Sequence, residues 1–484
     1  MTTSLPKAVS VKIPTLYLTQ LVSKIVRQLP KQTTIELLKG IHFEITSDSI
    51  TATSYNGVMA TRITKDLESP LKLERPLTMV LMHPSIGRVF NQLSGSMTTL
   101  KYDQVKKTVQ LTSDKSKYKL AAVDADDFPN VEDIITRVPR TGTLTAEFLK
   151  QSYSQLPKFT SASESRPVLQ GVQHSIKADG SIVLTSTDSF SLRTKRIPFY
   201  SEVEQDSTAV VPVAILTELS NLLNKIEEEK VYLHTSAKGI AFHWEDQENH
   251  LSFQLYSSLI DGNYPDTTKL VERDDASPRV RFVRASLEQA IKRVLVGTAG
   301  QDSNNQIHFG VKGRQARVFT KGEFPAIEDL ITESPYDGEI VFTFNPQFLL
   351  KNLQSFRSDE VLLTFTSSLR PVFVEDSGMT DGLSLLLPIR TTENVTVEWP
   401  EITEPLDFTP AAPTEVAPPE KQAVTCFVDT KSSPGQHFVT YQEVDSDEEP
   451  WGGYNIDPTD EALKQLNASI CDSENVEIAD TQYD

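Results

Sequence analysis

The sequence predicts an α+β protein built from a repeat of about 130 residues, with two helices and several antiparallel strands in each copy. Two observations predict this class. Segments that begin helices recur at a domain-sized spacing, and short runs of alternating apolar and polar residues lie between them. A chain of 484 residues is long enough for about three such domains.

The first set of predicted helices begins with proline, which is favoured at the first helical position because its missing N–H is not needed there. The three prolines, Pro84, Pro212 and Pro346, are 128 and 134 residues apart. A second set has apolar residues at the same helical spacing and begins at Pro14, Thr145 and Arg284. Thr145 and Ser286 are suitable N-caps.

Alternating segments such as KVYLHTS, GIAFHW, IHFGV, ARVFT and EVLLTFT predict antiparallel strands with one buried face. Two joints, residues 124–134 and 259–271, place an aromatic-proline pair after an acidic turn, and each precedes a new strand and helix. We therefore expect domains at residues 1–135, 136–275 and 276–391, followed by a tail at 392–484.

The net charge of −19 is carried by the tail. From Thr391 onward there are 21 acidic and three basic residues, which leaves 45 acidic and 44 basic residues in the body. The overall charge therefore does not exclude a nucleic-acid partner for the body. Nine prolines and the acidic cluster 445–449 predict that residues 392–484 are largely disordered, with a possible amphipathic helix at 457–470.

Both cysteines, Cys426 and Cys471, lie in the tail, so the body has no disulfide framework and no thiolate metal site. The chain also has no signal peptide at its start and no apolar run long enough to span a membrane. These features predict a soluble cytoplasmic protein.

The sequence contains no phosphate-binding loop, dinucleotide fingerprint, HExxH motif or GxSxG elbow. Ser186, Asp188 and Ser191 lie together without a nearby histidine, and His83 has no second metal ligand near it. We therefore expect no catalytic residue, no metal, no cofactor and no enzymatic activity.

Basic residues recur between the apolar positions of the predicted helices, where they face away from the core. Ordinary solvated helix surface explains any one of them, but their recurrence on all the helices favours a sequence-independent surface for a DNA phosphate backbone. The residues predicted to face DNA are Lys24, Arg27, Arg88, Lys150, Lys158, Lys225, Lys292, Arg293, Lys351 and Arg357.

Residues 166–199 resemble a motif of the bacterial beta sliding clamp, the DNA polymerase III beta subunit family; the matching residues are Arg166, Leu169, Gly171, Thr187, Asp188 and Leu192. LIDGNYPD (259–266) resembles the end of that family's second domain, and LLLPIRT (385–391) resembles its carboxyl end. The resemblance covers about four-fifths of the chain and implies that the clamp ends near Thr391.

The resemblance implies a ring-shaped, head-to-tail homodimer of three clamp domains per copy that encircles duplex DNA in the bacterial cytoplasm or nucleoid. It also implies partners, the replicative polymerase and the clamp loader, which bind through short linear peptides. We assign the dimer interface to Tyr118, Leu120, Leu295 and Val296. The peptide pocket that the resemblance implies comprises Leu169, Thr187, Ser189, Phe190, Ser191, Leu192, Pro265, Lys269, Leu270, Leu385, Leu386, Leu387, Pro388, Ile389 and Arg390.

The chain departs from the family pattern at several of these positions. Ser189, Phe190 and Ser191 stand where the family has Gly-His-Arg, Lys269 stands where arginine is common, and Gln32 stands where the family often has a DNA-contacting arginine. These departures and the tail favour a phage- or plasmid-borne clamp. They also leave open a clamp-like interaction protein that binds the same peptides without ring function.

Overall fold

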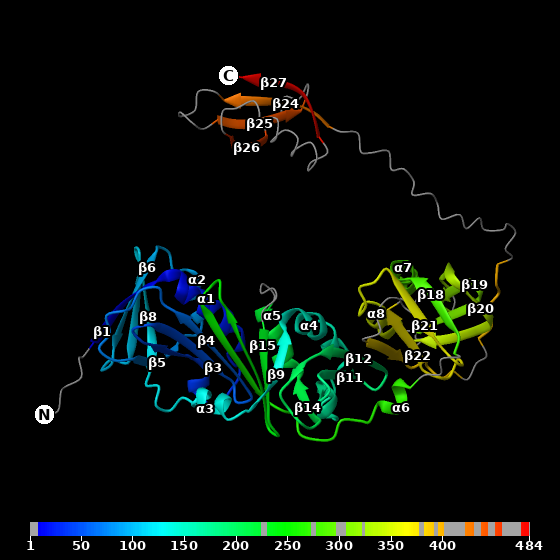
Figure 1. The fold of residues 1–484 in the computed structure, drawn as a ribbon, viewed down its shortest axis with the longest axis horizontal. Helices are drawn as coiled ribbons and strands as arrows, with labels where there is room; N and C mark the ends of the chain where they lie inside the picture. Colours follow the sequence, from blue (N-terminus) through cyan, green and yellow to red (C-terminus); the bar gives the residue numbers. More distant parts are fainter. Residues whose placement is uncertain are drawn as a thin grey trace. The chain divides into compact units, whose positions relative to one another are not determined.

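The computed structural model describes residues 8–223, 230–272, 277–296, 306–321, 325–376, 382–391 and 395–400, together with four strands between residues 422 and 483 (Figure 1). By its internal contacts the chain divides into two compact units, Met1–Val397 and Glu398–Asp484. The first unit contains three repeats, here defined by their strands: β1 to β8, β9 to β17, and β18 to β23.

In the first repeat, α1 (Thr15–Ile25) and α2 (Ile86–Asn91) pack against each other, and α1 also contacts β3 and β4. Leu18, Leu21, Val22 and Ile25 are fully buried at the spacing predicted for one helix face. Two 3-10 helices, η1 (Val26–Gln28) and η2 (Glu36–Lys39), follow α1. The strands are β1 (Ala8–Pro14), β2 (Ile41–Ile45), β3 (Ser49–Tyr55), β4 (Met59–Asp66), β5 (Leu77–Met82), β6 (Met97–Asp103), β7 (Thr108–Ser113) and β8 (Ser116–Val123).

The second repeat has the corresponding helix pair, α4 (Ala146–Tyr153) and α5 (Val213–Leu223), and two 3-10 helices, η3 (Leu156–Phe159) and η4 (Pro167–Gln170). The short helix α3 (Val131–Thr136) precedes it. The strands are β9 (Arg140–Thr145), β10 (Gly171–Lys177), β11 (Ser181–Thr187), β12 (Ser191–Pro198), β13 (Tyr200–Ser201), β14 (Ser207–Pro212), β15 (Lys230–Thr235), β16 (Gly239–Asp246) and β17 (Leu251–Ser258).

The third repeat follows α6 (Thr268–Val271) and contains the pair α7 (Arg284–Val296) and α8 (Pro346–Leu353). In Figure 1 each helix pair lies on one side of the strands of its own repeat. The strands are β18 (Arg279–Val283), β19 (Ile307–Phe319), β20 (Ile327–Phe344), β21 (Glu360–Thr364), β22 (Val372–Asp376) and β23 (Gly382–Leu386). Of the helices described, none is long and apolar enough to cross a membrane.

Strand pairing continues across both boundaries between repeats. β4 of the first repeat pairs with β17 of the second, so their strands form one sheet in the order β1-β6-β7-β8-β5-β2-β3-β4-β17-β16-β15-β9-β13. β12 of the second repeat pairs with β23 of the third in the order β14-β10-β11-β12-β23-β22-β21-β18. The α+β class and the repeat of helix pairs and antiparallel strands are therefore confirmed.

The helix starts differ from the prediction in detail. Pro346 is the first residue of α8, and the Asn345 side chain caps it by accepting a hydrogen bond from Gln347 N at 3.0 Å. Pro212 instead ends β14, because its fixed φ also suits an extended edge residue. Ser286 is not an N-cap, since α7 already begins at Arg284, and the Thr145 side chain makes no capping hydrogen bond.

Four segments of the tail are strands, within a region that is otherwise outside the described residues. The strands β24 (Gln422–Asp429), β25 (His437–Glu443), β26 (Trp451–Ile456) and β27 (Val476–Tyr483) form a sheet in the order β26-β25-β24-β27. β24 and β25 are rich in β-branched and aromatic residues, which favour strands, and the prolines elsewhere in the tail obscure this in its overall composition. The predicted helix at 457–470 lies outside the described residues.

A buried polar pair marks the core of the second repeat. His174 is fully buried, and its Nδ1 lies 3.0 Å from the Val172 carbonyl oxygen, so Nδ1 carries the hydrogen and donates it. Nε2 then accepts from the Tyr153 hydroxyl at 2.7 Å. Burial lowers the pKa of His174 to about 4, and the hydrogen bond to the Val172 carbonyl partly opposes this decrease. Burial raises the pKa of Tyr153.

We predict that this histidine makes the fold sensitive to acid. Between pH 6.5 and about 4 the unfolded chain binds a proton at His174 and the folded chain does not, so stability falls as the pH falls through that window. The loss is on the order of 2–3 kcal/mol for this group. Calorimetric melting of the His174→Leu/Tyr153→Phe double variant at pH 7 and pH 5 should show a smaller decrease in Tm than wild type; an equal decrease would contradict the assignment.

Candidate functional site

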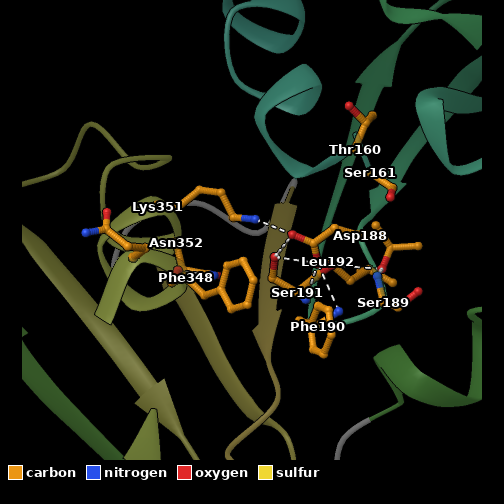
Figure 2. Close-up of polar contacts among 12 residues, drawn as sticks. Thr160, Ser161, Asp188, Ser189, Phe190, Ser191, Leu192, Phe348, Lys351 and Asn352 are labelled. Atoms are coloured by element: carbon orange, nitrogen blue, oxygen red, sulfur yellow. Dashed lines mark hydrogen bonds and ion pairs between the residues drawn. The ribbon is translucent and has the colours of Figure 1, made fainter. Parts of the chain in front are cut away.

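The predicted carboxyl-terminal run lies beside the predicted loop of the second repeat. β23 pairs with β12 so that Leu386 is opposite Ser191 and Leu385 is opposite Leu192. The pairing extends by one bond, because Leu387 N donates to the Phe190 carbonyl at 2.9 Å. Residues that are almost 200 positions apart in sequence therefore meet at the boundary between the second and third repeats. Figure 2 shows residues 188–192 of the second repeat at this boundary.

The turn between β11 and β12, residues 187–191, is ordered by the side chain of Asp188. Its Oδ1 accepts hydrogen bonds from the backbone N–H groups of Phe190 at 2.9 Å and Ser191 at 2.7 Å, and the Ser191 hydroxyl contacts both carboxylate oxygens at 3.1 Å. Ser189 has a φ of 78°, in the left-handed region that most non-glycine residues avoid. The turn therefore holds a strained residue in place through a local hydrogen-bond network.

Two contacts join this turn to helix α8 of the third repeat (Figure 2). Lys351 Nζ lies 2.5 Å from Asp188 Oδ2, with the two side chains only 16% and 12% exposed. The Phe190 ring stacks on the Phe348 ring, with centroids 5.4 Å apart and planes at 14°. Lys351 Nζ also lies 4.8 Å from the ring centroids of Phe348 and Phe159.

The expectation that Lys351 faces DNA is therefore wrong. Residues three apart on a helix share a face, so Lys351 lies beside Phe348 and points with it toward the second repeat. An ammonium group in this half-buried position is stabilised by the Asp188 carboxylate and by the two aromatic rings.

Most residues of the predicted pocket fall into a buried group, to which Thr187 also belongs, or an exposed group, and Pro388 and Ile389 are half-buried. Leu169, Ser191, Leu192, Leu385 and Leu386 are nearly or fully buried, and Leu386 belongs to the core of the third repeat. These side chains are not available to a partner in this structure, which corrects their assignment as contact residues. The exposed group consists of Ser189, Phe190, Pro265, Lys269, Leu270, Leu387 and Arg390.

Sequence reasoning missed two residues that build this site. Tyr264 accepts a hydrogen bond from Thr187 N at 3.0 Å through its hydroxyl oxygen, which ties the loop before α6 to the end of β11. Burial raises the pKa of Tyr264, and the nearby Asp188 carboxylate adds to the effect. Phe348 was the other omission. Its position three residues before Lys351, and so on the same face of the predicted helix, was the available signal.

The other residues predicted to face DNA have varied surroundings. Lys24 and Lys150 are half-buried, and Lys24 Nζ lies 5.4 Å from the Phe253 ring centroid. Arg293 donates two hydrogen bonds to Glu328, at 2.7 and 3.1 Å, and this contact raises its pKa. Lys292 lies 3.5 Å from Glu288. The exposed members of the set are Arg27, Arg88, Lys158, Lys292, Arg293 and Arg357, and Lys225 lies outside the described residues.

Among the predicted interface residues, Leu120 is only 1% exposed and packs in the core of its own repeat, so its side chain does not face a partner. Tyr118 is half-buried against the same core. Leu295 packs similarly in the third repeat, whereas Val296 is 76% exposed. The backbone of β8 has a partly open edge. β5 pairs with β8 only at Ala121–Val123, so among the described strands Ser116–Leu120 are paired with β7 on one side only.

Comparison with family models identifies two matches. A model of the DNA polymerase III beta subunit, N-terminal domain, matches residues 9–132, and one of its central domain matches residues 143–266. The beta sliding clamp of Streptococcus pneumoniae is 26% identical over 372 residues, covering 75% of this chain and 95% of that protein. The beta sliding clamp of Bacillus subtilis is 24% identical over 381 residues, covering 77% and 97%.

Solved structures show the same fold. The DNA polymerase sliding clamp of Bacillus subtilis superposes with a TM-score of 0.71 at 22% identity, covering 79% of this chain and 99% of that one. The beta subunit from Streptococcus pyogenes gives a TM-score of 0.71 at 24% identity, covering 79% and 100%. A Pseudomonas aeruginosa sliding clamp bound to griselimycin gives 0.70 at 16% identity, covering 79% and 99%.

We predict that position 189 tolerates glycine and rejects β-branched residues. Ser189→Ile should lower stability by about 1–2 kcal/mol, because a branched Cβ clashes with the backbone at this φ. Ser189→Gly is the matched control and should differ from wild type by less than about 1 kcal/mol. Chemical unfolding of both variants measures the difference; equal stabilities would show that the turn relaxes to another conformation.

Proposed function

We infer the function from the family: this chain belongs to the DNA polymerase III beta subunit family, the bacterial beta sliding clamps. It is a DNA sliding clamp, a processivity factor for the replicative polymerase. The observation that carries this conclusion is the threefold repeat of a helix pair on antiparallel strands, joined by strand pairing at both boundaries.

We propose that two copies close a ring around duplex DNA in the bacterial cytoplasm or nucleoid. The action is then topological and needs no catalytic residue. Exposed Lys and Arg side chains, such as Arg88 on helix α2 and Arg27 and Lys158 on the 3-10 helices η1 and η3, would contact phosphates without fixing a register, which permits sliding. We place the limits of the three clamp domains at 1–135, 136–275 and 276–391.

We propose that the exposed group at the boundary of the second and third repeats, together with Phe348, is the surface that binds short peptides of the polymerase and the clamp loader. Its exposed apolar side chains are Phe190, Leu270 and Leu387, and its cationic side chains are Lys269 and Arg390. An apolar contact area with a few polar groups suits an extended peptide. We refer to these residues below as the peptide surface.

A clamp-like interaction protein without ring function is the second candidate. Two observations favour it: Gln32 stands where the family often has an arginine, and Lys351 and Arg293 are engaged by carboxylates of the same chain. The two candidates differ in one property, since only a closed ring is held on DNA by topology.

We predict that the loaded protein stays on nicked circular plasmid in 1 M NaCl and is lost when the plasmid is cut to a linear form. At that salt the Debye length is about 3 Å, so phosphate contacts alone do not retain the protein. Velocity sedimentation after loading by a bacterial clamp loader measures the bound fraction. Equal retention on circular and linear DNA would refute the ring, and loss from both at 1 M NaCl would favour the second candidate.

The open edge of β8 supports the proposed dimer contact. Ala122 N donates to the Lys107 carbonyl at 2.9 Å, so by the alternation of an antiparallel ladder the even-numbered residues bond to β7. The N–H groups of Lys117 and Lys119 therefore point to the open side. On the third repeat, β20 pairs with β19 alone among the described strands, and Ile327 on it is 53% exposed.

We predict that Lys119→Pro weakens the dimer more than tenfold, because proline removes an N–H from the open edge and its ring obstructs an approaching strand. Pairing with β7 uses the neighbouring residues, so the fold should persist. Sedimentation equilibrium at micromolar concentration measures the change. Lys119→Ala removes the same side chain and keeps the N–H, so it should remain a dimer. If both variants stay dimeric, β8 is not the interface strand.

A further inference from the structure

We propose that the boundary between the first and second repeats is a further docking surface, which takes a basic side chain, arginine above lysine, of a partner protein. The side chain enters a cavity between α3 and the face of β2, β3 and β4 that points away from the helix pair. This surface is separate from the peptide surface, which lies at the other boundary, and it has the opposite charge. The inference goes beyond the proposed function and does not depend on it.

The cavity lies on the outer face of the first sheet. Phe43 of β2 belongs to the core that α1 and α2 cover, so its neighbours His42 and Glu44 point to the opposite face. Strand pairing places His42 opposite Thr53 and Thr53 opposite Arg62 on that same face. In Figure 1, α3 lies on the side of these strands away from α1 and α2. The cavity is therefore not on the side of the sheet that carries the helix pair.

The turn between β3 and β4 repeats the construction of the turn at 187–191. Asn56 Oδ1 accepts hydrogen bonds from the backbone N–H of Val58 and of the next residue, at 3.0 and 2.8 Å, as Oδ1 of the aspartate does in the other turn. Gly57 between them has a φ of 95°. From β17 of the second repeat, Ser258 N donates to the Val58 carbonyl at 3.0 Å. Each boundary thus fixes a turn that carries an exposed apolar residue, here Val58 at 50%.

The linkers at the two boundaries are also alike. In each, an aromatic-proline pair leads to a side chain that binds the backbone at the start of the next helix. Asn130 Oδ1 accepts from Asp133 N at 3.1 Å before α3, and Asp266 Oδ1 accepts from Thr268 N at 3.0 Å before α6. The first boundary therefore has the same frame as the boundary at which the peptide surface lies, with different side chains on it.

The cavity has the size of one long side chain. Its volume is about 230 Å³, which is below the roughly 300–1,000 Å³ of a small-molecule site. Phe128 is buried beside it and stacks on His42, with ring centroids 5.1 Å apart and planes at 17°. Burial, together with the charge of Arg62, lowers the pKa of His42 to about 4, so the imidazole is neutral at pH 7. An ordered, uncharged pair of rings suits the stem of an anchoring residue.

The charged groups that line the cavity favour a cation. Arg62 Nη2 lies 3.3 Å from Glu132 of α3 and 3.7 Å from Glu44 of β2. Among the residues that the structure describes, neither carboxylate has another basic partner, and their side chains are 60% and 36% exposed. Two carboxylates and one guanidinium leave one negative charge unbalanced. Arginine is favoured over lysine because a planar guanidinium can bind two carboxylates at once.

The charge of the surroundings separates this surface from the peptide surface. The linker and helix at residues 124–136 contain five acidic residues and no basic one. The peptide surface carries Lys269 and Arg390 instead. A basic segment is therefore attracted to the first boundary and repelled from the second, so the two surfaces select different partners.

The first test selects a displayed library of random nine-residue peptides on the full-length protein. We expect arginine to be enriched at one peptide position on wild type and not on Glu44→Gln/Glu132→Gln, which keeps the side-chain shape and removes both charges. Glu36→Gln/Asp103→Asn is the matched control, because it removes two carboxylates of the same repeat that pair with lysines outside the cavity. It should select the same peptides as wild type.

The second measurement uses the best selected peptide, labelled with fluorescein, and a version in which citrulline replaces its arginine. Wild type should bind the arginine version about tenfold more tightly, the effect of a charge-assisted hydrogen bond weakened by solvent. Glu44→Gln/Glu132→Gln should bind both versions equally, with melting of the variant as the folding control. Equal affinities on wild type, where no residue is changed, would overturn the proposal, as would an undiminished preference on the folded double variant.

A third variant separates this inference from the proposed function. Phe190→Asp alters the other boundary and should leave the affinity for the arginine peptide unchanged. If Phe190→Asp abolishes binding and Glu44→Gln/Glu132→Gln does not, the peptide binds at the peptide surface, which supports the proposed function and overturns this inference. A library that yields no peptide dependent on the two carboxylates also overturns it, and leaves the proposed function as it stands.

Discussion

Strand pairing between repeats is the constraint on which the rest of this structure depends. A β-strand edge exposes a row of backbone N–H and C=O groups that must be paired, covered or solvated. Here the edge of each repeat is paired with the next, β4 with β17 and β12 with β23, so the three repeats share two continuous sheets. The pairing at β12 and β23 also sets the positions of Phe190 and Leu387, and thus of the peptide surface.

The sequence was sufficient to predict features that depend on local periodicity. The recurrence of helix pairs and the antiparallel strands between them could be read from the order of apolar and polar residues. The residues of the turn at 187–191 and the run at 385–390 could be associated only through a family resemblance. Nothing in their local pattern states that Ser191 lies opposite Leu386, because that pairing is a property of the assembled sheet.

The wrong predictions share one physical cause, which is that exposure is decided by neighbours distant in the sequence. Lys351 follows the pattern of a solvated helix face, yet the turn of another repeat lies against that face and supplies a carboxylate. Leu120 was assigned to a partner through the family resemblance, but its side chain packs in the core of its own repeat.

The boundary between the second and third repeats combines features that stability alone does not explain. A largely buried ion pair must overcome the desolvation of both charges, and well-packed apolar residues are often at least as stable in such positions. A serine at positive φ adds strain that glycine would relieve. Both features serve a single result, because Asp188 orders the turn with one oxygen and receives Lys351 with the other. The conformation of the turn is thereby coupled to the packing of α8, so that the surface offered by Phe190 exists only when the two repeats are correctly joined.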